Sequence, residues 1–251
     1  MLSRRDLLRT AAIASGVAAA GCDVSDNKGL PAPLPQSQTP APQVSAEPSR
    51  PPLPAEVVNG PRDKPNVALT FHGQGDATIV KQILHELSLG QAPATVLAVG
   101  SWLAAQPGPA KLVLDAGHEL GNHTQNHLAI SAMKPAQALA EIKSCADELK
   151  KLTGSIGKWF RPSQTQYSNE LIRAQATAAG YETCLSYDLD SLDYQDPGAK
   201  AVVRNVLSGV KNGSIISLHF GHTGTIAAIA GILDGLREKA LKPVTMTEMM
   251  N

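Results

Sequence analysis

Hydrophobic and polar positions along the chain follow two alternating patterns from residue 64 onward. Short runs that are almost continuously apolar, such as residues 66–71 and 94–99, have the length of strands that are covered on both faces. Between such runs, apolar residues recur every three or four positions, which is the spacing of an amphipathic helix. The clearest predicted helix spans residues 135–152 and is followed by Gly154, a residue type that commonly ends helices.

The other predicted elements continue this alternation to the end of the chain. Further strands are predicted at residues 118–123, 159–160, 183–187, 214–218 and 243–245. Helices are predicted at residues 76–89, 102–115 with a break at 107–109, 171–179, 199–210 and 225–239. About seven strand–helix alternations predict an α/β fold with a parallel sheet, either open and doubly wound or closed into a barrel. In both architectures the chemistry lies at the carboxyl ends of the strands.

Residues 1–22 have the layout of an export signal, because a basic segment at 3–9 precedes an uncharged, weakly apolar stretch. The basic segment resembles the twin-arginine signal S-R-R-x-[FL]-[LI]-[KR]. Residues 19–22 resemble a bacterial lipobox, although Ala19 stands where lipoboxes usually carry Leu. We expect export to the cell envelope and a membrane anchor through lipid on Cys22. A plain secretory signal, giving a secreted or periplasmic protein, and a short cytosolic amphipathic helix are the alternatives.

Residues 23–63 are predicted to form a Pro-rich disordered linker. Nine of the 18 prolines lie between residues 31 and 54, and only Glu47 and Arg50 are charged in that window. Such a segment buries too little apolar surface to offset its ordering entropy, and it favours extended polyproline conformations. We therefore expect one folded domain at residues 64–251, held away from the membrane by a semi-stiff spacer.

Charge and cysteine content narrow the function classes. The chain has 22 Lys plus Arg against 22 Asp plus Glu, and this balance without a basic block argues against a nucleic-acid partner. No apolar run approaches the roughly 20 residues that span a bilayer, so membrane contact is expected only through the lipid anchor. Cys145 and Cys184 are interpreted as two small buried hydrophobic residues rather than a disulfide, although export would permit one.

Polar side chains gather where the predicted strands end. Five of the seven histidines lie at or next to strand ends, namely His72, His118, His123, His127 and His219. The accompanying charged residues are Asp76, Arg161, Asp190 and Asp193. A single histidine beside a strand is usually structural, and we expect only a structural hydrogen bond from His118. Five histidines on one rim predict a functional site.

The segment G-H-E-L-G-N-H-T-Q-N-H at residues 117–127 resembles the second motif, H-[ST]-x-x-H with its lead-in, of the polysaccharide deacetylase family. This family is the NodB-homology domain of carbohydrate esterase family 4. Arg161-Pro162 resembles the third motif, D-S-L-D-Y at 190–194 the fourth, and Leu218-His219 the fifth. The resemblance covers residues 66–251 in motif order and implies a distorted seven-stranded β/α barrel as a single catalytic domain. It also implies hydrolytic removal of N-acetyl or O-acetyl groups from a cell-envelope or extracellular polysaccharide or oligosaccharide.

A metal site is expected from the second motif. His123 and His127, four residues apart, can face one ion if the segment turns helically. Imidazole ligands suit zinc, with cobalt or nickel as alternatives. A divalent ion would make its bound water more acidic and polarise the acetamide carbonyl. The alternative is that His127 only caps or covers the following helix and that His123 alone is functional.

The later motifs imply the remaining roles. By resemblance, His219 is the general acid that protonates the leaving amine, and an adjacent carboxylate, Asp190 or Asp193, keeps its imidazole charged and oriented. The alternative for the two aspartates is turn formation. Arg161 resembles the arginine that pairs with an active-site carboxylate, and a surface ion pair is its alternative.

The first motif departs from the family pattern. The family carries T-F-D-D-G, with a general base followed by a metal ligand, whereas here Thr70 and Phe71 precede His72 and Gly73. His72 can replace the missing ligand and give a three-histidine site. Alternatively Asp76, on a glycine-flanked loop, can swing back as base or ligand. A catalytically degenerate, lipid-tethered carbohydrate-binding protein and a different reaction on the same scaffold remain the other hypotheses.

Overall fold

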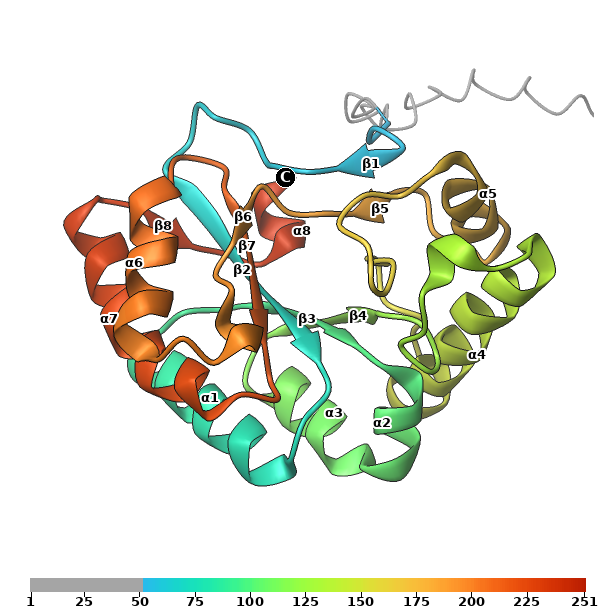
Figure 1. The fold of residues 1–251 in the computed structure, drawn as a ribbon, viewed down its shortest axis with the longest axis horizontal. Coiled ribbons are helices and arrows are strands. Elements are labelled where there is room, and N and C mark those ends of the chain that lie inside the picture. The colour runs from blue at the N-terminus through green and yellow to red at the C-terminus, as the bar shows by residue number, and fades with distance from the viewer. Residues whose placement is uncertain (1–51) are drawn as a thin grey trace, which may run out of the picture. The chain divides into compact units, whose positions relative to one another are not determined.

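The computed structural model of the protein describes residues 52–251 (Figure 1). The predicted export signal, Cys22 and the linker up to residue 51 lie outside the described residues. Within the described part of the chain, no helix combines the length and the apolar character that crossing a membrane requires.

Parallel strands form a curved wall in the centre of the domain. The main sheet has the order β4 (Glu119–Asn122), β3 (Thr95–Ala98), β2 (Asn66–Gly73), β7 (Ile215–His219) and β6 (Leu189–Asp190), and β8 (Lys242–Pro243) pairs with the start of β2. Single bridges continue the wall from Asn122 to Phe160 and from Phe160 to Cys184 of β5 (Cys184–Leu185). The wall therefore has seven strand positions, which are the five strands of the main path, the bridged residue Phe160 and β5. The predicted α/β fold, a distorted seven-stranded barrel, is confirmed.

Helices α1 to α7 cover the outside of this wall, as Figure 1 shows, whereas α8 packs against the apolar cluster inside the barrel. Their bounds are α1 (Ala77–Leu89), α2 (Gly100–Ala105), α3 (Pro107–Asp115), α4 (Pro135–Thr153), α5 (Glu170–Ala178), α6 (Ala199–Gly209), α7 (Thr223–Glu238) and α8 (Met246–Met249), with 3₁₀ turns η1 (Ile130–Ala132) and η2 (Asp193–Gln195). The second predicted helix is interrupted as expected, but the break lies at Gln106, and the predicted break at 107–109 forms the first turn of α3. Pro107 begins α3 because the first helical position needs no backbone N–H partner.

The alternation of side chains along β2 decides which residues face the barrel interior. Val67, Leu69 and Phe71 pack in the large apolar cluster under the helices, whereas Ala68 packs in a second cluster inside the barrel. Successive side chains of a strand point to opposite faces, so His72 points inward with Ala68. The odd-numbered Gly73 lies on the helix side.

The folded domain begins before the predicted boundary at residue 64. Residues 56–57 form β1 (Glu56–Val57), which pairs in parallel with β5, and Val57 is buried. The backbone N–H of Gly60 also donates to the carbonyl of Gly213 at 2.8 Å. The proline content of this region concealed a two-residue strand, because a strand that short carries no alternation to recognise.

The two described cysteines are free and buried, which confirms their interpretation as separate small hydrophobic residues. Cys145 donates from Sγ to the carbonyl of Ala98 at 3.3 Å. Burial raises the pKa of the Cys145 thiol to about 12, so this side chain is an inert part of the core at neutral pH.

Candidate active site

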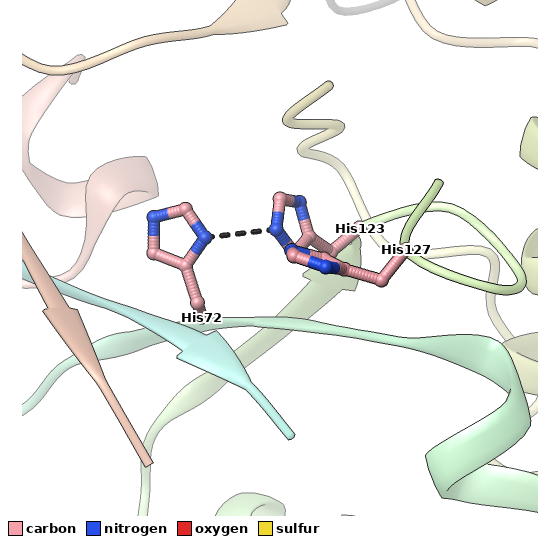
Figure 2. Close-up of side chains that lie close together, drawn as sticks. All are labelled: His72, His123 and His127. Atoms are coloured by element: carbon pink, nitrogen blue, oxygen red, sulfur yellow. Dashed lines mark hydrogen bonds between the residues drawn. The ribbon is translucent and has the colours of Figure 1, made fainter. Parts of the chain in front are cut away.

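Three histidines converge at the carboxyl ends of β2 and β4 (Figure 2). His72 is the last residue but one of β2, His123 directly follows β4, and His127 lies in the loop beyond it. The ring centroids of His72 and His123 are 4.5 Å apart, and those of His123 and His127 are 4.8 Å apart. One nitrogen from each ring lies within 4.8 Å of the others, so the three could hold a metal ion.

The helical turn expected between His123 and His127 is wrong, although the two rings do meet. The segment is a loop in which Thr124 and His127 adopt positive φ angles of 67° and 54°. These left-handed residues fold the chain back on itself, which brings the His127 ring beside His123 without a helix. The backbone N–H of Thr124 donates to Asn122 Oδ1 at 2.8 Å and holds the start of this loop.

Hydrogen bonds orient two of the three imidazole rings. His72 Nδ1 lies 2.8 Å from His123 Nε2, and His72 Nε2 lies 3.0 Å from Ser217 Oγ. His123 Nδ1 lies 2.9 Å from the carbonyl oxygen of Arg161. A carbonyl only accepts, so His123 Nδ1 carries the proton and donates it there. The lone pair of His123 Nε2 therefore faces His72.

Electrostatics keep the three imidazoles uncharged. Burial, followed by repulsion from neighbouring histidines, lowers the pKa of His72 and of His123 well below the ordinary value. Burial also lowers the pKa of His127, and His219 adds to the effect. At neutral pH all three rings are consequently neutral, which is the protonation state that a metal ligand requires.

The partly exposed His219 and the buried Asp193 form a pair beside this cluster. The register between β2 and β7 places His72 opposite His219, and the two rings stack with centroids 4.3 Å apart. Asp193 Oδ1 lies 2.7 Å from His219 Nδ1, while its Oδ2 accepts from the His219 N–H and from Thr225 Oγ1. Burial opposes ionisation of Asp193, but the hydrogen bonds with His219 outweigh it and lower the pKa of Asp193. Of the two carboxylates left open by the sequence, Asp193 holds His219.

Asp190 remains free of His219 and faces a hollow instead. It ends β6, pairs in register with Ser217, and accepts from the backbone N–H of Leu192 at 3.0 Å. Burial raises the pKa of Asp190 above the ordinary value. The side chain therefore retains a basic carboxylate close to the histidines.

The hollow has a volume of about 390 Å³ and opens over the histidine cluster. We call it the histidine hollow, and its lining residues are His72, His127, Gln164, Thr165, Gln166, Tyr187, Asp190, Tyr194 and His219. Tyr194 is exposed at the rim, and its ring centroid lies 5.3 Å from that of His219. A larger hollow of about 560 Å³ is lined by Arg62, Lys211 and Lys239 with three uncharged residues, and it holds neither histidine nor carboxylate.

The carboxylate pairing expected for Arg161 is wrong. Arg161 is fully buried and donates from Nη2 to Thr70 Oγ1 at 2.9 Å and to the carbonyl of Ser186 at 3.0 Å. Its Nη1 has no partner among the described residues, and burial lowers the pKa of the guanidinium to about 10. Position 72 is an imidazole, and no described carboxylate forms an ion pair with Arg161, although Asp190 lies close enough to raise the pKa of the guanidinium slightly against the effect of burial.

Asp76 is not brought to the histidines. It is the exposed N-cap of α1, where its Oδ1 accepts from the backbone N–H of Thr78 at 2.7 Å. Hydrogen bonds with Thr78 lower the pKa of Asp76, and the side chain does not line the histidine hollow. His118, by contrast, makes the structural hydrogen bond expected of it, since its Nδ1 accepts from the N–H of Ala94 at 3.1 Å.

Position 73 has no room for the second aspartate of the family motif. A Cβ on Gly73 would lie 2.8 Å from Val96 Cγ1 and 2.9 Å from Ala98 Cα, on the helix side of β2. We expect Gly73→Asp to lower the free energy of unfolding by about 1–3 kcal/mol through overpacking, with no gain in zinc affinity. Urea unfolding of the full chain measures this.

Gly224→Asp is the matched control for that substitution, because nothing lies within 4 Å of a Cβ at this position. Its free energy of unfolding should stay within about 0.5 kcal/mol of the parent value. A Gly73→Asp chain that is as stable as the parent and binds zinc more tightly would contradict the packing argument.

Comparisons with known proteins identify the family to which this barrel belongs. The family model for polysaccharide deacetylases matches residues 59–184. A peptidoglycan-N-acetylglucosamine deacetylase of Bacillus cereus is 34% identical over 200 residues, covering 76% of this chain and 90% of that relative. The chain belongs to the polysaccharide deacetylase family. Family membership accounts for the parallel barrel.

Solved structures of polysaccharide deacetylases share the fold. The Bc1960 peptidoglycan N-acetylglucosamine deacetylase superposes with a TM-score of 0.73 at 25% identity, covering 78% of this chain and 92% of that one. A family pseudoenzyme from Bacillus anthracis superposes with a TM-score of 0.75, covering 79% of this chain and 70% of that one. At 21% identity the second similarity concerns the fold alone.

Several residues that line the histidine hollow or contact its histidines carried too weak a signal in the sequence. Tyr187 follows β5 and contacts the Arg161 guanidinium, with 5.3 Å between the Arg161 Cζ and the ring centroid. Ser217 lies inside a strand between two apolar residues. Gln164 follows the third motif without being part of it. Tyr187 and Gln164 share only the signal of a polar or aromatic residue beyond a strand, which many loops carry, and Ser217 is a single polar residue in the interior of a mainly apolar strand.

Proposed function

We propose that the chain is a metal-dependent hydrolase that removes N-acetyl, or O-acetyl, groups from a polysaccharide of the cell envelope or outside the cell. One observation carries this proposal. Three uncharged imidazoles converge at the histidine hollow beside the His219–Asp193 pair, so a metal site and a proton donor share one cavity. Family membership supports the hydrolytic reaction.

The donor set fits a divalent transition metal. His72, His123 and His127 supply three neutral imidazole nitrogens, which suits zinc, with cobalt and nickel as alternatives. When bound, such an ion polarises the substrate carbonyl and makes a coordinated water more acidic. The Arg161 carbonyl fixes the His123 ring by accepting from Nδ1, in the way that second partners commonly orient metal-binding histidines.

His219 is assigned as the proton donor to the leaving amine. Its Nδ1 is held by Asp193, so the transferred proton comes from Nε2. An amine leaves poorly as an anion, and a positioned imidazolium supplies the proton it needs. The ionised Asp193, which also accepts from Thr225, stabilises that imidazolium and fixes its orientation.

Asp190 is assigned as the proton acceptor that the first motif no longer provides. Positions 72 and 73 carry an imidazole and a glycine, and Asp190 is the one carboxylate among the residues that line the histidine hollow. Its half-buried position makes it a stronger base than an exposed aspartate. Asp76, at the exposed start of α1, is not assigned a role in the reaction.

The substrate class and the location follow from separate observations. The Bacillus cereus relative and the Bc1960 protein act, by their names, on the N-acetylglucosamine of peptidoglycan, and we infer an acetylated glycan of this kind as substrate. Tyr187 and Tyr194 line the histidine hollow, where their aromatic rings can pack against a sugar ring. Export, with a lipid anchor on Cys22 and the Pro-rich spacer that the sequence predicts from residue 23, is inferred from the sequence.

Acetate release from N-acetylated peptidoglycan by the full chain tests the function. We expect release after zinc is added to chelator-treated protein and none before, because the neutral histidine cluster supplies no Lewis acid by itself. Oligosaccharide binding without acetate release under zinc, cobalt or nickel would contradict the hydrolase and favour the carbohydrate-binding alternative.

The same assay with Asp190→Asn tests the proton acceptor. Asp190 must be ionised to act, and its raised pKa keeps it protonated to a higher pH than an ordinary aspartate. The rate of the parent should therefore fall as pH drops through that raised pKa, and Asp190→Asn should lower the rate by about 10²–10⁴-fold. Asp196→Asn, an exposed carboxylate outside the histidine hollow, is the control, and equal rates in the two variants would remove Asp190 from the mechanism.

A further inference from the structure

Ser217 has a side chain inside the barrel in direct contact with the histidine cluster. It lies in β7 between Ile216 and Leu218, which pack on the helix side, and its own side chain is 1% exposed. The register places Ser217 between Thr70 of β2 and Asp190 of β6. Its Oγ lies 3.0 Å from His72 Nε2, so the hydroxyl reaches the ring nitrogen that faces away from the other two histidines.

The hydrogen-bond chain through His72 determines where its proton lies. His123 donates from Nδ1 to the Arg161 carbonyl, so its neutral ring accepts at Nε2. The contact of 2.8 Å then requires His72 to donate from Nδ1. The remaining nitrogen, His72 Nε2, consequently accepts, and Ser217 Oγ donates to it.

A metal ion held by the cluster requires the opposite arrangement at His72. The nitrogen that faces His123 is Nδ1, and as a ligand it must offer a lone pair instead of a proton. The proton of the neutral ring then resides on Nε2 and points at Ser217 Oγ. A hydroxyl can serve both states, because it carries one donor and two acceptor lone pairs and can rotate.

We propose that Ser217 is a positioning residue that satisfies both tautomers of His72, donating to Nε2 in the metal-free protein and accepting from Nε2–H when His72 binds metal. The inference rests on the proposed three-histidine metal site. Replacement by alanine leaves the His72 N–H buried without a partner in the loaded state, which destabilises that state. Second partners of metal-binding histidines commonly raise metal affinity in this way.

Zinc binding by calorimetry on the chelator-treated full chain tests the inference without a substrate. We expect Ser217→Ala to weaken zinc binding by about 10–100-fold, with unchanged stoichiometry. Ser217→Thr keeps the hydroxyl and should restore most of the affinity. Ser214→Ala is the matched control, since this buried serine precedes the same strand and its hydroxyl contacts Asp188 and Lys211 rather than a histidine.

NMR of the histidine ring nitrogens shows which nitrogen of His72 carries the proton. A serine with a purely structural role would not require this proton position to change when zinc binds. In the parent chain the His72 proton should reside on Nδ1 without zinc and on Nε2 with zinc. A proton already on Nε2 in the metal-free chain would overturn the inference. So would zinc affinities of Ser217→Ala and Ser214→Ala that agree within about threefold, or a folded parent that binds no zinc.

These outcomes separate the inference from the proposed function. A parent chain that binds zinc, switches the His72 tautomer and still releases no acetate would contradict the hydrolase while supporting the role of Ser217. Acetate release with a Ser217→Ala zinc affinity equal to that of the parent would support the hydrolase and overturn the role of Ser217.

Discussion

Replacing His219 by alanine is expected to lower the rate of acetate release by about 10²–10⁴-fold, because the leaving amine then lacks its positioned proton donor. The zinc affinity of the full chain should stay within about threefold of the parent value, since His219 stacks on His72 but is not among the three ligands assigned to the metal. Acetate release and zinc calorimetry on the same preparation measure the two effects.

His85→Ala is the matched control for this variant, because His85 is exposed on α1 and does not line the histidine hollow. Its rate and zinc affinity should equal those of the parent. Turnover that is unchanged in His219→Ala would remove this residue from the mechanism. Loss of zinc binding together with the rate would show that His219 is part of the metal site instead.

Replacing His123 by alanine is expected to abolish tight zinc binding, with a loss of affinity of at least about 100-fold. His123 is the central member of the cluster, because its ring lies beside both His72 and His127. Removing it also leaves the Arg161 carbonyl without its hydrogen bond. Loss of a direct ligand should exceed the 10–100-fold cost that is typical for a second partner. Calorimetry on chelator-treated full chains, with circular dichroism to verify folding, measures it.

The comparison with His72→Ala and Asp76→Ala identifies the third ligand. We expect His72→Ala to weaken zinc binding to a similar degree and Asp76→Ala to leave it unchanged, because Asp76 caps α1 and lies outside the histidine hollow. The reverse result would mean that the loop at residues 73–76 rearranges around the metal. A folded parent without any zinc binding would contradict metal-assisted hydrolysis and favour the carbohydrate-binding alternative.

Much of the architecture was predictable because it depends on local periodicity. The apolar run at residues 94–99 and the helical spacing at 135–152 each correspond to an observed element, β3 and α4. Short elements such as β1, β6 and α8 were missed, since two to four residues carry no recognisable period. The positions of β1 and β6 depend on pairing with distant strands, and α8 is held by hydrogen bonds with Thr95 and Glu119, none of which a local pattern encodes.

The features of the site likewise separate into those that local sequence determines and those that depend on tertiary contacts. The sequence by itself determined which residue types stand at the strand ends, and the alternation along β2 already requires His72 and Gly73 to face opposite sides. Only the tertiary structure decided that Asp193 holds His219, that Arg161 has no carboxylate partner, and that left-handed backbone carries His127 to the cluster. Such partnerships depend on strand register and loop dihedral angles between residues far apart in the chain.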